Sequence, residues 1–257
     1  MSEEGEQTKE AAIISLFQEW DGCTNCELGE LRKERHSKTQ GRYRNMVMGD
    51  GNVDADIVVI GIGPGEEEDE TGMPYIGPSG EILNEHLSKV GILRTDLFLM
   101  NVVASRPVSE IEDFKTKRKR VEQRDPSLQE REACRKLWQE VIYLIDPLII
   151  VALGKPAIAE VLGVRAPTLT SMQGRVKTGQ IPGRAVPATY TVIPMYHPAY
   201  LARSGDVFEK GVWHQSDIAW YRTVYFLDRL RYHYRGTPIP DRGFKRSDLF
   251  TTSREWV

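Results

Sequence analysis

Four short apolar runs constrain this chain most, because each contains or precedes residues suited to binding or catalysis. The first run, residues 56–60, is followed by the turn at 61–65, and the second run, 97–103, contains Asn101 and precedes residues 105–107. The third run, 148–153, is followed by residues 154–156, and the fourth run, 190–196, is followed by His197 and Pro198. Segments with helical spacing separate the runs, which is typical of a parallel sheet with helices on both faces. Ligands of such sheets bind beyond the carboxyl ends of the strands. The sequence therefore predicts an α/β fold in which the glycine-rich turn, Asn101 and His197 meet at one pocket.

A single domain accounts for this alternation of strands and helices. Helices are predicted at residues 11–20, 81–90, 126–145, 156–163 and 216–232. Residues 23–51 are predicted to be irregular, 108–123 a charged connection, and 164–189 an extended or hairpin-like connection. We expect a disordered N-terminus over residues 1–10, one domain over 11–235 and a C-terminal surface tail over 236–257.

Composition and charge exclude some classes of protein. The 257 residues are 40% hydrophobic and 28% charged, which is ordinary for a globular chain. No stretch approaches the roughly 18 apolar residues that a membrane helix needs, and the N-terminus has no secretory signal pattern. We therefore expect a cytoplasmic protein that does not enter membranes, and a monomer.

The net charge of −3 does not by itself indicate a polyanionic partner, because affinity for phosphates depends on where Lys and Arg are placed. The densest basic run is residues 115–120, in which five of six residues are Lys or Arg. Taken alone, this run is more typical of a solvated loop than of a nucleic-acid contact.

The three cysteines, Cys23, Cys26 and Cys134, indicate something other than a disulfide framework, because their number is odd. The spacing of Cys23 and Cys26 suits a metal ion, an iron–sulfur cluster or a redox pair. Buried structural thiols are the alternative.

The glycine-rich turn at 61–65 allows a ligand to approach the backbone closely. No Gly-Lys-Ser/Thr follows it, so it is not a Walker A loop, and its spacing does not fit the dinucleotide fingerprint. The acidic residues 66–69 would repel a phosphate at this turn. A flat, neutral ligand that forms hydrogen bonds fits the turn better than a nucleoside triphosphate.

Residues 61–80, GIGPGEEEDETGMPYIGPSG, resemble the first motif of the family-4 uracil-DNA glycosylases. Asn101 to Val103, followed by Arg106-Pro107, resembles the second block of that family, and residues 197–201 with Arg203 resemble its closing His-Pro motif. The three cysteines resemble three of the family's four iron–sulfur ligands. The resemblance spans roughly residues 11–232, in the family's order.

This resemblance implies a three-layer α/β/α sandwich with a central four-stranded parallel sheet. It also implies hydrolysis of the N-glycosidic bond of deoxyuridine in DNA, after the base is flipped out of the stack. The expected partner is therefore DNA that contains uracil, and the expected cofactor is an iron–sulfur cluster.

The resemblance also implies a role for individual residues. His197 would stabilise the charge that develops on uracil, Asn101 would pair with the uracil edge, and Tyr75 would stack on the base, where many relatives have Phe. The other implied base and DNA contacts are Gly63 through its backbone, Glu68 against the pyrimidine C5 so that thymine is excluded, and Tyr200, Leu201 and Arg203 in the loop that enters DNA.

Two positions depart from the family pattern. Family-4 enzymes usually have Glu where this chain has Ile62, and a cysteine where it has Ser105. Three states of the cluster site follow: Ser105 completes a [4Fe–4S] cluster, the cysteines hold an incomplete cluster, or the cluster is absent. The sequence thus predicts a uracil-DNA glycosylase. The alternatives are a weakly catalytic or inactive uracil- or DNA-binding relative, and a cluster-bearing partner in a repair assembly.

Overall fold

The computed structural model describes residues 8–38, 45–89, 91–112, 119–165, 168, 172, 177–181 and 188–203. The predicted helix at 216–232, the predicted tail at 236–257 and most of the predicted disordered N-terminus lie outside these residues. None of the helices within the described ranges is long and apolar enough to span a membrane.

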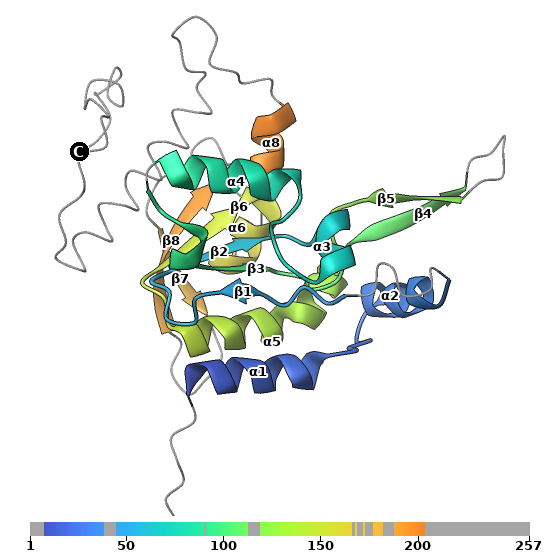
Figure 1. The fold of residues 1–257 in the computed structure, drawn as a ribbon, viewed down its shortest axis with the longest axis horizontal. Helices are drawn as coiled ribbons and strands as arrows, with labels where there is room; N and C mark the ends of the chain where they lie inside the picture. Colours follow the sequence, from blue (N-terminus) through green and yellow to red (C-terminus); the bar gives the residue numbers. More distant parts are fainter. Residues whose placement is uncertain are drawn as a thin grey trace, which may run out of the picture.

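A six-stranded mixed sheet forms the centre of the domain (Figure 1). Its strands, in spatial order, are β1 (Asp50–Gly51), β3 (Leu97–Asn101), β2 (Ile57–Gly61), β6 (Ile149–Leu153), β8 (Ala188–Met195) and β7 (Lys177–Ile181). The four central strands are parallel, as the four apolar runs predicted. The predicted number of strands is wrong, because β1 and β7 add antiparallel edges. Neither edge strand is a continuous apolar run, so the pattern that reveals buried strands does not mark them.

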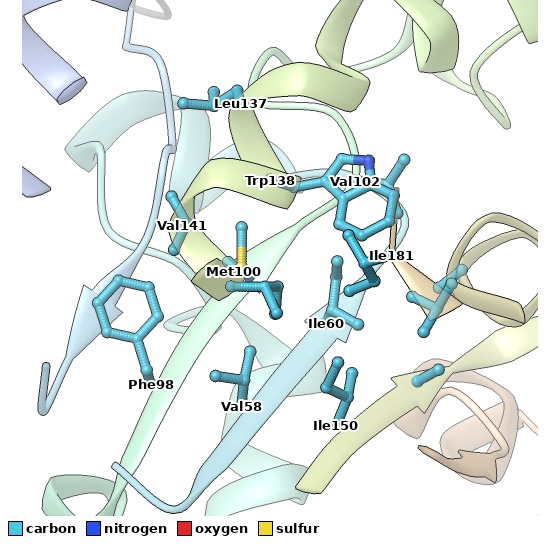
Figure 2. Close-up of a cluster of buried hydrophobic side chains, with 14 of the residues drawn as sticks. Val58, Ile60, Phe98, Met100, Val102, Leu137, Trp138, Val141, Ile150 and Ile181 are labelled. Carbon is cyan, nitrogen blue, oxygen red and sulfur yellow. The ribbon is translucent and has the colours of Figure 1, made fainter. Parts of the chain in front are cut away.

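The central strands read as continuous apolar runs because both faces of the sheet are covered. Alternate residues enter two separate clusters: Val58, Ile60 and Ile150 face one side, and Val59 and Val151 face the other. Figure 2 shows the first cluster, in which Trp138 and Val141 of a helix cover the strand residues Val58, Ile60, Met100 and Ile150.

Helices lie on both faces of the sheet, which confirms the predicted three layers. The first cluster includes residues of α1 (Lys9–Trp20), α5 (Leu128–Ile145) and α6 (Gly154–Leu162), and α1 packs against α5. The second cluster includes Leu83 and Leu87 of α4 (Pro78–Lys89), and the short α8 (Pro198–Arg203) packs against α4. The short η1 (Arg94–Asp96) precedes β3.

The helix ends differ slightly from the predicted ones. Helix α1 begins at Lys9, where Thr8 accepts a hydrogen bond from the backbone of Ala11, so the last two residues of the predicted disordered N-terminus are helical. Helix α5 begins at Leu128 after Ser127, whose hydroxyl accepts a hydrogen bond from the backbone of Glu130. A serine with glutamate three residues later is a capping box, and it sets this start more strongly than the Asp-Pro pair at 125–126.

Two segments predicted to be irregular contain regular structure. Residues 23–51 include the helix α2 (Glu27–Lys38). Its sequence is so polar that no helical spacing of apolar residues indicates it. The charged connection includes β4 (Val108–Glu112) and β5 (Lys119–Gln123), which pair as an antiparallel hairpin and extend away from the rest of the described domain (Figure 1). Apart from the buried Val108, the apolar residues of these strands, Ile111 and Val121, are exposed, so the sequence lacks the apolar alternation of a strand with one buried face.

The order of the parallel strands places a crevice at the centre of the sheet. The chain passes from β2 outward to β3 and then crosses to β6 on the other side of β2. The loops that leave β2 and β6 therefore diverge, and a crevice forms beyond the carboxyl ends of these two strands.

Candidate active site

A cavity of about 810 Å³ lies at this crevice. Its lining includes Gly63 after β2, Asn101 at the end of β3, Gly154 after β6 and His197 after β8. The structure therefore brings together the turn, the asparagine and the histidine that follow the four apolar runs. A cavity of this size falls in the range of small-molecule sites.

The first turn is held against the end of β3 by backbone hydrogen bonds that continue the parallel ladder. Val102 N donates to Gly61 O at 2.9 Å, and Val103 N donates to Ile62 O at 3.1 Å. A Cβ atom at Gly63 would lie 2.9 Å from Val103 Cγ2 and 3.0 Å from Pro107 Cδ, which is too close. A side chain at this position would therefore displace Val103 or Pro107, and the residue lines the cavity with its backbone alone.

Asn101 is the last residue of β3 and lies directly opposite Gly61 in the sheet register. Its side chain is buried yet contributes to the cavity lining. An amide in this position can offer one donor and one acceptor to a ligand.

His197 follows β8, and one of its ring nitrogens is engaged by the protein. The backbone N–H of Ala199 donates to His197 Nδ1 at 3.2 Å. Because Nδ1 accepts, the neutral ring carries its proton on Nε2. The ring is thus set to donate from Nε2, at a residue that lines the cavity.

Glu68 lies in α3 (Glu66–Thr71) and organises the first motif. Its carboxylate accepts hydrogen bonds from the backbone N–H groups of Gly65 at 3.0 Å, Ile76 at 3.1 Å and Gly77 at 2.9 Å. These bonds close the loop between α3 and α4 around one buried side chain. The predicted role of Glu68, exclusion of thymine, stays a prediction; closure of this loop is a role that the sequence did not reveal.

Tyr75 lines the cavity from this loop and has an unusual backbone conformation. Its φ of 53° is left-handed, which costs about 1–3 kcal/mol for a residue other than glycine. Arg94 donates to the carbonyl oxygens of Pro74 at 2.7 Å and Tyr75 at 3.1 Å, and Glu68 binds the next amide, that of Ile76. The bonds on both sides hold Tyr75 in place, so that the ring stays in the cavity wall.

The base of the β4–β5 hairpin forms part of the cavity rim, which the sequence did not predict. Arg106 Nε donates to Gln123 Oε1 at 2.8 Å, and Gln123 Nε2 donates to Pro64 O at 3.0 Å. Arg124 Nε donates to Val108 O at 3.1 Å. The bond from Gln123 fastens the hairpin to the first turn, and the other two join the arms of the hairpin at its base. Most of the basic run at 115–120 lies outside the described residues.

A comparison with protein families identifies the class of this site. The profile of the uracil DNA glycosylase superfamily matches residues 48–219, more than half of the chain. The matched span contains every residue that lines the cavity.

The chain belongs to the uracil-DNA glycosylase superfamily.

Several similar proteins carry the name type-4 uracil-DNA glycosylase. One from Thermotoga maritima is 35% identical over 186 residues, which are 70% of this chain and 86% of that protein. One from Pyrobaculum aerophilum is 33% identical over 184 residues, covering 70% and 80% of the two chains. One from Archaeoglobus fulgidus is 31% identical over 191 residues, covering 73% and 82%. The resemblance to the family-4 enzymes is therefore confirmed.

The remaining superfamily positions divide between the cavity and the surface. Ile62 lines the cavity and also packs against the first core cluster. Tyr200 is exposed in α8, and its ring stacks on Tyr196 with centroids 4.9 Å apart. The side chains of Leu201 and Arg203 lie outside the described residues, although both residues belong to α8.

The three cysteines lie near one another, and none of them lines the cavity. A hydrogen bond from Cys134, together with the backbone N–H groups of Gly29 and Leu28, lowers the pKa of the Cys26 thiol. The same bond to Cys26, and burial, raise the pKa of the Cys134 thiol. Cys134 also interacts with Cys23 and with the backbone of Ala104.

This set of donors does not fit a four-thiolate cluster. The fourth position is Ser105, which is buried beside Ala104. All three cysteines are free thiols, and no group of three or more His, Cys, Asp or Glu side chains in the described ranges is arranged to hold a metal ion. A [4Fe–4S] cluster is normally held by four thiolates, and serine oxygen binds iron less well.

Glu130 holds Arg124 at the cavity rim through a buried ion pair. The two guanidinium nitrogens donate at 2.7 and 2.6 Å, and the backbone N–H of Ser127 donates at 2.6 Å. Burial raises the pKa of the Glu130 carboxyl, but the bonds from Arg124 and Ser127 outweigh burial and hold that pKa below its ordinary value. The ion pair therefore stabilises the folded state when the carboxyl is ionised.

We expect Glu130→Gln to lower the free energy of unfolding at neutral pH by about 2 kcal/mol, since hydrogen bonds to a charged group are lost. The carboxylate's contribution is fully present above the unfolded-state pKa of about 4.3 and is lost as the pH falls through the lower folded-state pKa. Urea unfolding of both proteins should thus show a difference that shrinks with acidification. Glu132→Gln, on an exposed position of the same helix, is the control. A difference that does not change with pH would contradict this account.

Proposed function

We propose that this protein is a uracil-DNA glycosylase that hydrolyses the N-glycosidic bond of a flipped deoxyuridine in DNA, releasing uracil and leaving an abasic site for base-excision repair. The observation that carries the proposal is the placement of Asn101 and His197 on one cavity in a chain of this superfamily. The cavity wall also includes the ring of Tyr75 and the bare backbone of Gly63. These are the groups needed to hold a flat base by stacking and by hydrogen bonds.

The chemistry requires stabilisation of the leaving group. Cleavage of the bond leaves uracil as an anion and the sugar as an oxocarbenium-like cation. A donor at His197 Nε2 stabilises the developing negative charge, in the manner of an oxyanion hole. Since Ile62 and Gly63 supply no base in the first turn, departure of uracil, rather than strong activation of water, carries most of the catalysis.

For the base to enter this cavity, its nucleotide must flip out of the duplex. The exposed Tyr200 on α8, with Leu201 and Arg203 beside it in the sequence, is suited to the gap that the base leaves. Arg106 and Arg124 line the cavity, and we propose that their positive charges contact the sugar–phosphate backbone beside the flipped base. The proposed partner is therefore uracil-containing DNA.

The proposal is tested by a strand-nicking assay on uracil-containing single-stranded and duplex DNA. The wild type is expected to form abasic sites, which heat or alkali converts into strand breaks. Asn101→Ala and His197→Ala proteins are expected to form far fewer. Absence of abasic sites above the His197→Ala background would refute the proposed activity.

A binding relative with little catalysis is the second candidate, and Ile62 is the observation that favours it. Family-4 enzymes usually carry Glu at this position, whereas Ile62 packs partly against the core. This candidate predicts affinity for uracil-containing DNA without base release. A large rise in turnover on Ile62→Glu substitution would support it, and rapid turnover by the wild type would exclude it.

We propose that the iron–sulfur site implied by the resemblance is incomplete, because it lacks one of the four thiolate ligands. We expect Ser105→Cys to raise the iron content of anaerobically purified protein toward about four irons per chain, because it restores a four-thiolate set. Iron and sulfide analysis, with absorbance near 400 nm, measures this change. A Ser105→Cys protein that holds no more iron than the wild type would contradict it. Ser109→Cys, at a residue of β4, is the control for iron that binds any added thiol.

A further inference from the structure

The Tyr75 hydroxyl is a buried polar group that has no hydrogen-bond partner among the residues that the structure describes. The side chain is 5% exposed. Leaving a buried hydroxyl without a partner costs free energy, and such groups in folded proteins call for a specific explanation. Stacking on a base does not supply one, because a phenylalanine ring stacks equally well.

The hydroxyl lies beside the amide of Asn101. A Cβ atom built on Gly61 would overlap the Tyr75 hydroxyl and would lie 2.8 Å from Asn101 Oδ1. The two oxygen atoms therefore share the space that the missing side chain of Gly61 leaves open. The hydroxyl oxygen is closed off from solvent, so it does not contact a ligand in the cavity directly. It can affect such a ligand only through Asn101.

The backbone around Tyr75 favours a functional explanation. Its left-handed φ of 53° is maintained by Arg94 on one side and by Glu68 on the other. Strain of this kind persists only where the surroundings enforce it, and it concentrates at functional sites. Burial and the nearby Glu68 raise the pKa of the Tyr75 hydroxyl, so the group remains a neutral donor at physiological pH.

We propose that the Tyr75 hydroxyl is a positioning group that donates a hydrogen bond to Asn101 Oδ1 when a base is bound. This bond would fix the amide with Oδ1 facing the N3–H donor of uracil and Nδ2 facing its O4 acceptor. The reversed amide would instead suit cytosine, which presents an acceptor at N3 and a donor at its amino group. The inference rests on the proposed function, since it concerns how the same cavity reads the base.

The test compares Tyr75→Phe with a matched control, Tyr190→Phe. Tyr190 is equally buried and its hydroxyl also lacks a partner within the described residues, but it lies in β8 and does not line the cavity. Each substitution removes an unbonded buried hydroxyl, so both proteins should melt at or above the wild-type temperature. Only Tyr75→Phe should lose function.

Two functional measurements are made on each protein. The first is affinity for duplex DNA with 2′-fluoro-deoxyuridine, which resists cleavage, relative to the same duplex with 2′-fluoro-deoxycytidine. The second is the single-turnover rate of uracil release. We expect Tyr75→Phe to weaken the first and slow the second about tenfold, as for loss of one hydrogen bond, and Tyr190→Phe to leave both unchanged.

A double-mutant cycle tests whether the hydroxyl acts through Asn101. In the Asn101→Ala background, Tyr75→Phe should have no further effect on affinity, because the acceptor is already absent. If Tyr75→Phe weakened affinity equally in that background, the inference would be overturned. Wild-type affinity in the Tyr75→Phe protein would also overturn it, as would a loss of affinity accompanied by a lowered melting temperature.

The same experiments separate this inference from the proposed function. A wild-type protein that prefers the uracil analogue but releases no uracil contradicts the enzymatic activity, while the affinities still decide the role of Tyr75. A wild-type protein that neither releases uracil nor distinguishes uracil from cytosine overturns both.

Discussion

His197→Ala is expected to lower the single-turnover rate of uracil release by about 100- to 1000-fold, the usual cost of removing one oxyanion-stabilising donor. The reason is the hydrogen bond from Ala199 to Nδ1, which leaves Nε2 as the proton donor of the neutral ring. The rate is measured with enzyme in excess over uracil-containing DNA, by heat- or alkali-induced strand breaks.

The control for this substitution is His86→Ala. His86 lies in α4, where its Nδ1 is 2.7 Å from the carbonyl oxygen of Ile82, and it does not line the cavity. Its removal should leave the rate near that of the wild type. If His197→Ala retained a wild-type rate while remaining folded, leaving-group stabilisation by this residue would be wrong.

Glu68→Ala is expected to lower the free energy of unfolding by about 3 kcal/mol, because three backbone N–H groups lose their acceptor and an unsatisfied buried donor costs about 1–3 kcal/mol. These donors are Gly65, Ile76 and Gly77. Uracil release should fall as well, since Ile76 directly follows Tyr75. Urea unfolding gives the stability change, and the nicking assay gives the activity.

Glu67→Ala is the comparison for this prediction, because Glu67 is the preceding residue of the same helix and its side chain is exposed. Exposed substitutions usually change stability by less than about 0.5 kcal/mol. Equal stability losses in the two variants would show that the buried hydrogen bonds of Glu68 do not hold the loop.

The parallel core could be predicted because its sequence pattern has one physical cause. Strands covered on both faces need apolar side chains at nearly every position, so β2 and β6 appear as uninterrupted apolar runs and β3 and β8 as predominantly apolar ones. The hairpin could not be predicted in this way, because apart from Val108 the apolar residues of its charged strands are exposed. The edge strand β1 was missed because a two-residue strand gives no comparable signal, whereas β7 lies in the segment predicted to be extended or hairpin-like and pairs antiparallel with β8.

The position of the site could also be predicted, whereas the contacts inside it could not. Asn101 and His197 follow parallel strands, so the fold class alone brings them to one edge of the sheet. The Glu68 carboxylate accepts hydrogen bonds from the backbone of residues 65, 76 and 77, and Arg94 donates a hydrogen bond to the backbone carbonyl of Tyr75. No local pattern encodes such pairings, since they depend on how the loop closes.

The sequence by itself determined the class of fold, the superfamily and the end of the sheet at which the candidate active-site residues lie. These features follow from hydrophobic periodicity and from motifs of adjacent residues, both of which are local. Only the tertiary structure decided that a side chain at Gly63 would crowd Val103 and Pro107, that the Tyr75 hydroxyl is buried beside Asn101, and that the Cys26 and Cys134 thiols lie close together. Those features arise where segments distant along the chain come into contact, and their energetics depend on the burial and geometry of that contact.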